Sequence, residues 1–121
     1  MTFTVLVVDD SPTEVLRLKT MLEANGYRAL TASSGEEGIE VARAETPSLI
    51  LMDVVMPGLN GFQATRQLAR DPQTAEIPVV IVSTKSQPTD RVWGLRQGAK
   101  EYLVKPVEEG ALVAILEQFR D

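Results

Sequence analysis

Short apolar runs alternate along the chain with amphipathic stretches. Unbroken runs of β-branched and aliphatic residues occupy positions 4–8, 49–52 and 79–82. Strands that are covered by helices on both faces have this composition. Weaker apolar segments at 28–32 and 102–104 predict two more strands. The hydrophobic pattern therefore predicts five short strands.

Capping signals and helical periodicity predict five helices in the remaining stretches. Ser11 can cap a helix whose first turn holds Pro12 and Glu14, and Asn25-Gly26 can end it. Ser34 and Glu37 repeat the capping-box spacing, and the helix they open must stop before residue 47, a proline. The other three helices are expected over residues 62–70, about 90–97, and from about 112 to the chain end.

The alternation of strands and helices predicts a doubly wound α/β fold with a five-stranded parallel sheet and five helices. Parallel neighbours need long right-handed crossovers, and helices on both faces provide them. With 121 residues, the chain is expected to form one domain over 1–121 with no separate output domain.

Composition narrows the possible chemistry. The 44% hydrophobic content favours a folded domain, and the net charge of −5 argues against nucleic acid as a partner. The longest apolar runs are about four residues, whereas a membrane span needs about 20. The N-terminus lacks the pattern of a secretory signal, so we expect a cytoplasmic protein without a membrane partner. The absence of cysteine and histidine leaves carboxylates, hydroxyls, amines and oxygen-bound metals as reactive groups.

Polar side chains gather where the predicted strands end. Ligands bind beyond the carboxyl ends of strands in open α/β sheets. The residues at these positions are Asp9, Asp10, Asp53, Ser83, Thr84 and Lys105. Three carboxylates on one rim repel each other, and a divalent cation relieves the repulsion. Oxygen ligands favour a hard ion, so we expect Mg²⁺.

Simpler explanations exist for each of these residues alone. Asp9 and Asp10 could cap the next helix, but Ser11 already suits that position. Asp53 could form a turn, and Lys105 could be a solvated loop lysine. Their convergence at one rim is harder to explain by chance, so we interpret the set as one functional site.

Four ordered segments make the whole chain resemble the receiver domains of two-component response regulators. They are VVDDS at 7–11, LMDVVMPGLNG at 51–61, VST at 82–84 and GAKEYLVKP at 98–106. The resemblance implies the flavodoxin-like, CheY-like strand order 2-1-3-4-5. Segments at 10–14, 56–68 and 92–99 are more specifically similar to stand-alone receivers that regulate type IV pilus twitching motility.

The resemblance assigns a role to each site residue. Asp53 is the implied phospho-acceptor and a Mg²⁺ ligand, Asp10 binds Mg²⁺ directly, and Asp9 acts through water. The backbone carbonyl of Val55 is a further implied metal ligand. Lys105 is the implied cation that meets the phosphoryl group, and its bond to residue 106, a proline, is expected to be cis.

Switch and partner residues are also implied. Ser83 is the implied switch hydroxyl, at a position where many family members have threonine, and Tyr102 is the implied switch aromatic. The expected exposed partner surface consists of Arg91, Leu95, Tyr102 and Val104. Trp93 is expected to be a packing residue. The implied partners are a sensor histidine kinase or phosphotransfer protein and a downstream target, with the chain acting as a monomer.

Three other functions remain as alternatives. A flavodoxin-like electron carrier shares the architecture, but Asp9 and Asp10 would repel a flavin phosphate. A Mg²⁺-dependent phosphohydrolase needs a second acid, and Val55, two residues beyond Asp53, offers none. The third is a receiver that binds partners without phosphorylation. A true receiver would catalyse only its own phosphorylation and dephosphorylation.

Overall fold

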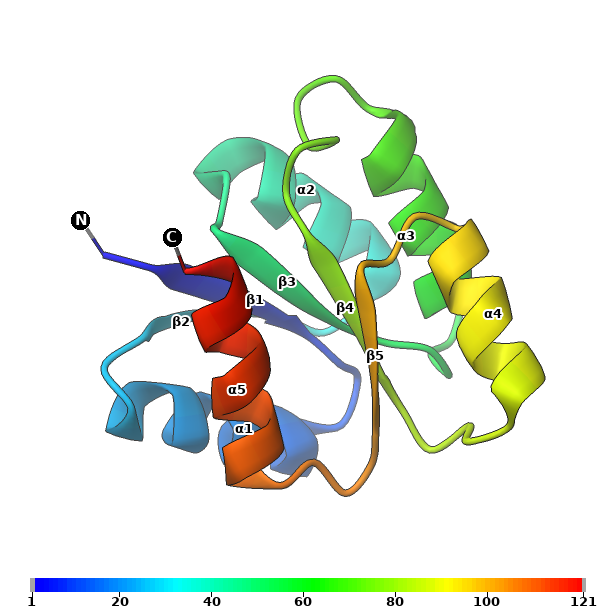
Figure 1. The fold of residues 1–121 in the computed structure, drawn as a ribbon. Helices are drawn as coiled ribbons and strands as arrows, with labels where there is room; N and C mark the ends of the chain where they lie inside the picture. The colour runs from blue at the N-terminus through cyan, green and yellow to red at the C-terminus, as the bar shows by residue number, and fades with distance from the viewer. Residues whose placement is uncertain (1, 121) are drawn as a thin grey trace.

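A parallel five-stranded sheet in the order β2-β1-β3-β4-β5 forms the centre of the computed structural model, which describes residues 2–120 (Figure 1). The strands are β1 (Thr4–Val8), β2 (Arg28–Ala32), β3 (Leu49–Asp53), β4 (Val79–Ser83) and β5 (Glu101–Val104). The helices are α1 (Pro12–Ala24), α2 (Gly35–Glu45), α3 (Gly61–Arg70), α4 (Pro88–Arg96) and α5 (Glu109–Phe119). The predicted doubly wound fold and its strand order are confirmed.

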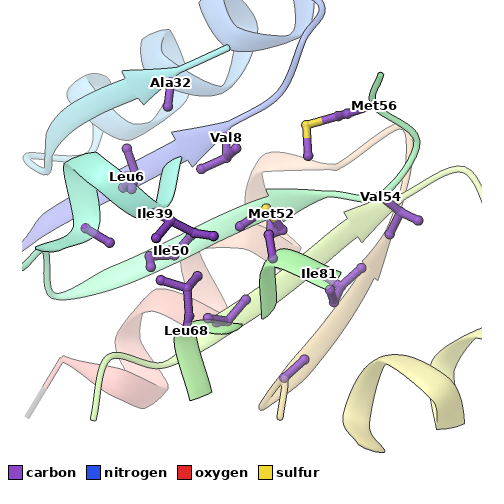
Figure 2. Close-up of a cluster of buried hydrophobic side chains, with 14 of the residues drawn as sticks. Leu6, Val8, Ala32, Ile39, Ile50, Met52, Val54, Met56, Leu68 and Ile81 are labelled. Atoms are coloured by element: carbon purple, nitrogen blue, oxygen red, sulfur yellow. The ribbon is translucent and has the colours of Figure 1, made fainter. Parts of the chain in front are cut away.

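Two apolar clusters lie on opposite faces of the sheet because successive strand residues point in opposite directions. Leu6 and Val8 of β1 belong to the cluster under α2 and α3 (Figure 2). Val5 and Val7 belong to the other cluster, with residues from α1 and α5. All five residues of β3 and of β4 are buried, which explains why their sequences are apolar without alternation.

The helix starts show how local sequence fixes the elements. The Ser11 hydroxyl accepts a hydrogen bond from the Glu14 amide, and the Ser34 hydroxyl accepts one from the Glu37 amide, as predicted. The second hydrogen bond of each predicted capping box, from the serine amide to the glutamate side chain, does not form, so this part of the prediction is wrong. Glu14 pairs with Arg17 instead, and the Glu37 carboxylate accepts from the amide and hydroxyl of Ser33.

Several boundaries differ from the prediction for identifiable reasons. Asp53 and Ser83 extend β3 and β4 by one residue because they pair with Val82 and Val104. Helix α4 begins at Pro88 rather than near Asp90, because the Asp90 carboxylate bonds the Gln87 amide and so closes the first turn. Among residues 2–120, no helix has both the length and the apolar content needed to cross a membrane.

Candidate functional site

Asp9, Asp53 and Lys105 meet at the carboxyl edge of the sheet. The Lys105 ammonium donates to Asp9 Oδ2 at 2.9 Å and to Asp53 Oδ1 at 3.0 Å. Asp9 follows β1, Asp53 ends β3 and Lys105 follows β5. The parallel topology thus brings together three charges that are up to 96 positions apart in the chain. The predicted convergence of these side chains is confirmed.

The carboxylates of Asp9 and Asp53 are both buried, and backbone groups hold Asp9 in place. The Asp9 amide donates to the Ala32 carbonyl, and Asp9 Oδ1 accepts from the Ser11 amide. Asp9 is therefore held between β2 and the start of α1. Asp10, the next residue, is exposed, so the two neighbouring aspartates occupy different environments.

Burial and charge shift the pKa values of the paired groups. Burial raises the pKa of Asp53, and the nearby charge of Asp9 raises it further, while the hydrogen bond from Lys105 opposes the rise. Burial acts to lower the pKa of Lys105, but its hydrogen bonds to Asp9 and Asp53 outweigh burial and raise that pKa. Lys105 is therefore a cation at neutral pH and partly compensates two buried acids.

The acidic residues at this edge form a donor set suited to a hard cation. Carboxylate oxygens of Asp9, Asp10 and Asp53 all lie within 4.8 Å of one another. Within residues 2–120, Lys105 is the one cation paired with this group, so the three carboxylates carry an excess of negative charge. Oxygen donors with this charge fit Mg²⁺ better than a softer metal.

Ser83 and Tyr102 meet at the backbone of Lys85. The buried Ser83 hydroxyl accepts from the Lys85 amide at 3.0 Å, and the Tyr102 hydroxyl donates to the Lys85 carbonyl at 2.8 Å. Burial raises the pKa of Tyr102, the nearby Ser83 hydroxyl opposes this, and the charge of Asp90 adds to the rise. The two implied switch residues are thus connected through the β4–α4 loop.

The expected exposed surface needs one correction. Arg91, Leu95 and Val104 are exposed, but Tyr102 is only 5% exposed, so its assignment as an exposed partner contact is wrong. Its ring lies against α4 at Gly94, where a Cβ atom would be 3.3 Å from the ring. The missing side chain at Gly94 therefore gives the tyrosine room to lie beneath the helix.

The expectation that Trp93 is a packing residue is also wrong. The side chain is 49% exposed and stands at the α3 side of α4. The only buried residue of α4 is Gly94. Helical periodicity is weak over this short helix, so the sequence did not separate its buried side from its exposed side.

One contact near Lys105 was not predicted from the sequence. Arg17 of α1 donates to the Val107 carbonyl at 2.6 Å and so ties α1 to the loop that follows Lys105. The Lys105-Pro106 bond is cis, as the resemblance implied. No sequence signal identified the Arg17 contact, because its partner is a backbone carbonyl 90 positions away.

The side chains of Val55 and Lys85 share a hollow next to the acidic cluster. Val55 is 63% exposed, and both residues line a hollow of about 480 Å³ with Trp93 and Phe62. Val55 belongs to the segment that follows Asp53, Lys85 lies across the hollow in the β4–α4 loop, and neither offers a carboxylate. The side chain of Thr84, also considered from its position after β4, is exposed.

Comparison with known proteins identifies relatives of the whole fold. The model of the response regulator receiver domain matches residues 5–117. Protein PilH of Pseudomonas aeruginosa is 59% identical over 109 residues, which cover 90% of both chains. Response regulator PleD of Caulobacter vibrioides is 40% identical over 91% of this chain and 24% of its own length. The solved structure of Vibrio cholerae chemotaxis protein CheY4 superposes with a TM-score of 0.92 at 28% identity, covering 98% of this chain and 99% of the other.

Proposed function

This chain belongs to the response regulator receiver domain family, and from that membership we propose that it accepts a phosphoryl group on Asp53 and thereby switches a protein-binding surface. The observation that carries the proposal is the pairing of Lys105 with Asp53 beside the Asp9 and Asp10 carboxylates. A nucleophilic carboxylate, a fixed cation and a hard-metal donor set are the components that phosphoryl transfer requires.

The proposed reaction uses the partner's phosphohistidine as donor. A carboxylate oxygen of Asp53 attacks the phosphorus, the P–N bond breaks, and its electron pair returns to the imidazole nitrogen of the partner. The product is an acyl phosphate on Asp53. Lys105 remains charged and offsets the negative charge on the phosphoryl oxygens.

We assign Mg²⁺ to the acidic donor set. Asp10 and Asp53 would hold the ion directly, Asp9 would act through water, and the Val55 carbonyl would supply a further oxygen. When bound, the ion neutralises charge on the transferring group. Asp9 is also bound to Lys105 and to the Ser11 amide, so its carboxylate is orientated by two donors before any ligand arrives.

The proposed switch starts from the contacts around Lys85. An acyl phosphate on Asp53 adds negative charge and acceptor oxygens. The Ser83 hydroxyl and Lys105 are the donors placed to turn toward it. Loss of the hydrogen bond between the Lys85 amide and the Ser83 hydroxyl would free the Lys85 backbone to move. The hydrogen bond from the Tyr102 hydroxyl to the Lys85 carbonyl would then break as well. The result would be a shift in the population of β4–α4 loop conformations.

The proposed output surface lies on α4 and β5. Arg91 donates to the Tyr102 carbonyl and pairs with Glu101, which places it beside β5. Leu95 and Val104 are the exposed apolar members of the surface. Tyr102 contributes from beneath, by its effect on the loop, because its ring is buried.

We further propose a cytoplasmic, monomeric, single-domain regulator that receives its phosphoryl group from a histidine kinase or phosphotransfer protein. The segments shared with twitching-motility receivers and the 59% identity to PilH support a role in type IV pilus control. The downstream target is a protein.

Intact-mass spectrometry after incubation with a small acyl phosphate and Mg²⁺ tests the function. The wild type should gain roughly 80 Da, the mass of one phosphoryl group, and Asp53→Asn should gain nothing. Omission of Mg²⁺ should also abolish the gain. Absence of a gain in the wild type would favour a receiver that binds partners without phosphorylation, and rapid release of phosphate from a neutral phosphate ester would favour a phosphohydrolase.

A further inference from the structure

Three arginines surround one hollow between α3 and α4. The hollow has a volume of about 430 Å³, and its lining includes Arg66 and Arg70 of α3, Arg96 of α4 and Trp93. Arg17, Arg43 and Arg91 each pair with a carboxylate. Within residues 2–120, none of the three arginines at the hollow forms an ion pair.

Helix dipoles explain only part of this cluster. Arg70 and Arg96 lie in the last turns of α3 and α4, where positive charge is favourable. Arg66 is a full turn before Arg70 and gains little from that effect. The dipole effect therefore does not account for Arg66, the third arginine that lines the hollow.

The local charge is opposite to that of the whole protein. The chain carries a net charge of −5, yet α3 contains no acidic residue. The only acid of α4 is Asp90, in the first turn, where its carboxylate accepts from the Gln87 amide. The end of these two helices that carries the arginines is thus a positive patch on an acidic protein, and it attracts negative ligands.

Trp93 connects this hollow to two others. Its ring also borders a hollow of about 340 Å³ with Pro88 and Val92, and one of about 480 Å³ with Val55 and Phe62. In Figure 1, α4 lies at the outer side of the fold, next to α3 and β5. Trp93 lines all three hollows, so together they offer more space than an inorganic anion requires.

We propose that this α3–α4 surface, consisting of Arg66, Arg70, Val92, Trp93 and Arg96, binds an acidic segment of a partner protein. Carboxylates of the segment face the arginines, and an apolar side chain packs on Trp93 and Val92. Exposed tryptophan and arginine are the residues that contribute most at protein interfaces. The surface differs from that of Arg91, Leu95 and Val104, which lies on the β5 side of α4.

A fluorescence titration of the unphosphorylated protein tests the proposal. Trp93 is the only tryptophan of the chain, so its emission reports binding at this surface. The probes are two synthetic peptides of equal length, one alternating glutamate pairs with leucine pairs and the other alternating lysine pairs with leucine pairs. The proposal predicts that the glutamate peptide changes the emission with saturation. If the net charge of −5 alone governed binding, the lysine peptide would change the emission instead.

A matched pair of double variants locates the binding. The double change Arg66→Gln with Arg96→Gln should weaken the affinity for the glutamate peptide by about tenfold or more, because each change removes a contact with a carboxylate. Lys19→Gln with Arg28→Gln changes the net charge equally but lies away from the surface, on α1 and β2, and should leave the affinity within about twofold. Circular dichroism should show that both variants are folded.

Three results would overturn the proposal. The first is binding of the lysine peptide in preference to the glutamate peptide. The second is equal weakening in the two double variants, which would indicate a general charge effect. The third is a saturable, arginine-dependent change of Trp93 emission with ATP or inorganic phosphate but not with the glutamate peptide, which would indicate a small-anion site. Because Asp53 takes no part in the assay, these results are independent of the proposed phosphorylation.

Discussion

Lys105 allows two buried carboxylates to lie beside each other. It contacts both Asp9 and Asp53, and these contacts keep its pKa high despite burial. The single positive charge leaves the cluster net negative without a metal. The raised pKa of Asp53 records this remaining repulsion together with the effect of burial.

Replacement of Asp53 should therefore stabilise the metal-free protein. The raised pKa means that folded Asp53 binds a proton more tightly than the unfolded residue does. Its contribution to stability is complete below the ordinary aspartate pKa of 3.8 and is lost as pH rises through the folded pKa. With a chelator at pH 7, Asp53→Asn should raise the melting temperature by a few degrees. The difference should shrink as pH falls toward 3.8, and a lower melting temperature at pH 7 would contradict the argument.

Mg²⁺ affinity should depend more on Asp10 than on Asp9. Asp10 is exposed at the cluster, whereas Asp9 is already bound to Lys105 and the Ser11 amide. Asp10→Ala should weaken Mg²⁺ binding at least about tenfold. Isothermal titration calorimetry measures the affinity, and Glu45→Ala, on an exposed site of α2, is the control. Equal affinity in Asp10→Ala and the wild type would refute the assignment.

The lifetime of the acyl phosphate should depend on Val55 and Lys85. Hydrolysis needs a water aligned opposite Asp53, and these two side chains line one hollow beside the segment that follows it. The Val55 side chain has no polar atom that could orient a water, and the charged Lys85 ammonium cannot accept a proton. Val55→Asn with Lys85→Glu should shorten the lifetime several-fold, as followed by the phosphorylated mass after removal of the donor. An unchanged or longer lifetime would show that these side chains do not control hydrolysis.

At the scale of elements, the start of α3 fixes the segment that follows Asp53. The Gly61 amide donates to the Val54 carbonyl, and the Asn60 and Gln63 side chains cap the helix reciprocally. A Cβ atom on Gly61 would lie 1.9 Å from the Asp53 carbonyl oxygen. The helix can thus begin directly against β3 only because residue 61 has no side chain.

Gly61→Ala should lower the free energy of unfolding by about 2 kcal/mol or more, because backbone atoms have to move to accept the methyl group. Gly110→Ala in α5 is the matched control, since a Cβ atom there would have no neighbour within 4 Å. That change should raise stability by about 0.5–1 kcal/mol through helix propensity. Urea denaturation measures both. Equal stability of Gly61→Ala and the wild type would contradict the close approach.

At the scale of the whole molecule, charge and surface favour a single copy in solution. The net charge of −5 makes copies repel one another at low salt. The large exposed apolar side chains are distributed over α1, the β3–α3 loop, α4 and β5. Sedimentation velocity at micromolar concentration should show a species of 13.2 kDa. A dominant dimer would contradict the expected monomer.

The fold class and the meeting of the main site residues could be predicted from the sequence alone. Uninterrupted apolar runs predict buried parallel strands, because both faces of such a sheet are covered. Since all their carboxyl ends lie at one edge, the positions of Asp9, Asp53 and Lys105 after their strands were enough to predict that they meet. Strand ends were less certain, because Asp53 and Ser83 are polar and extend their strands only by pairing with neighbours.

The exposure of side chains around α4 could not be predicted from the sequence. Tyr102 is buried and Trp93 is half exposed, opposite to the expectation for each. The burial of Tyr102 depends on Gly94, whose missing side chain lets Tyr102 and Phe62 approach α4. The meeting of Arg66, Arg70 and Arg96 likewise depends on how two helices pack. Hydrophobic periodicity indicates which side of an element is buried against the sheet. The contacts between neighbouring elements depend instead on the side-chain volumes of residues that are distant in sequence.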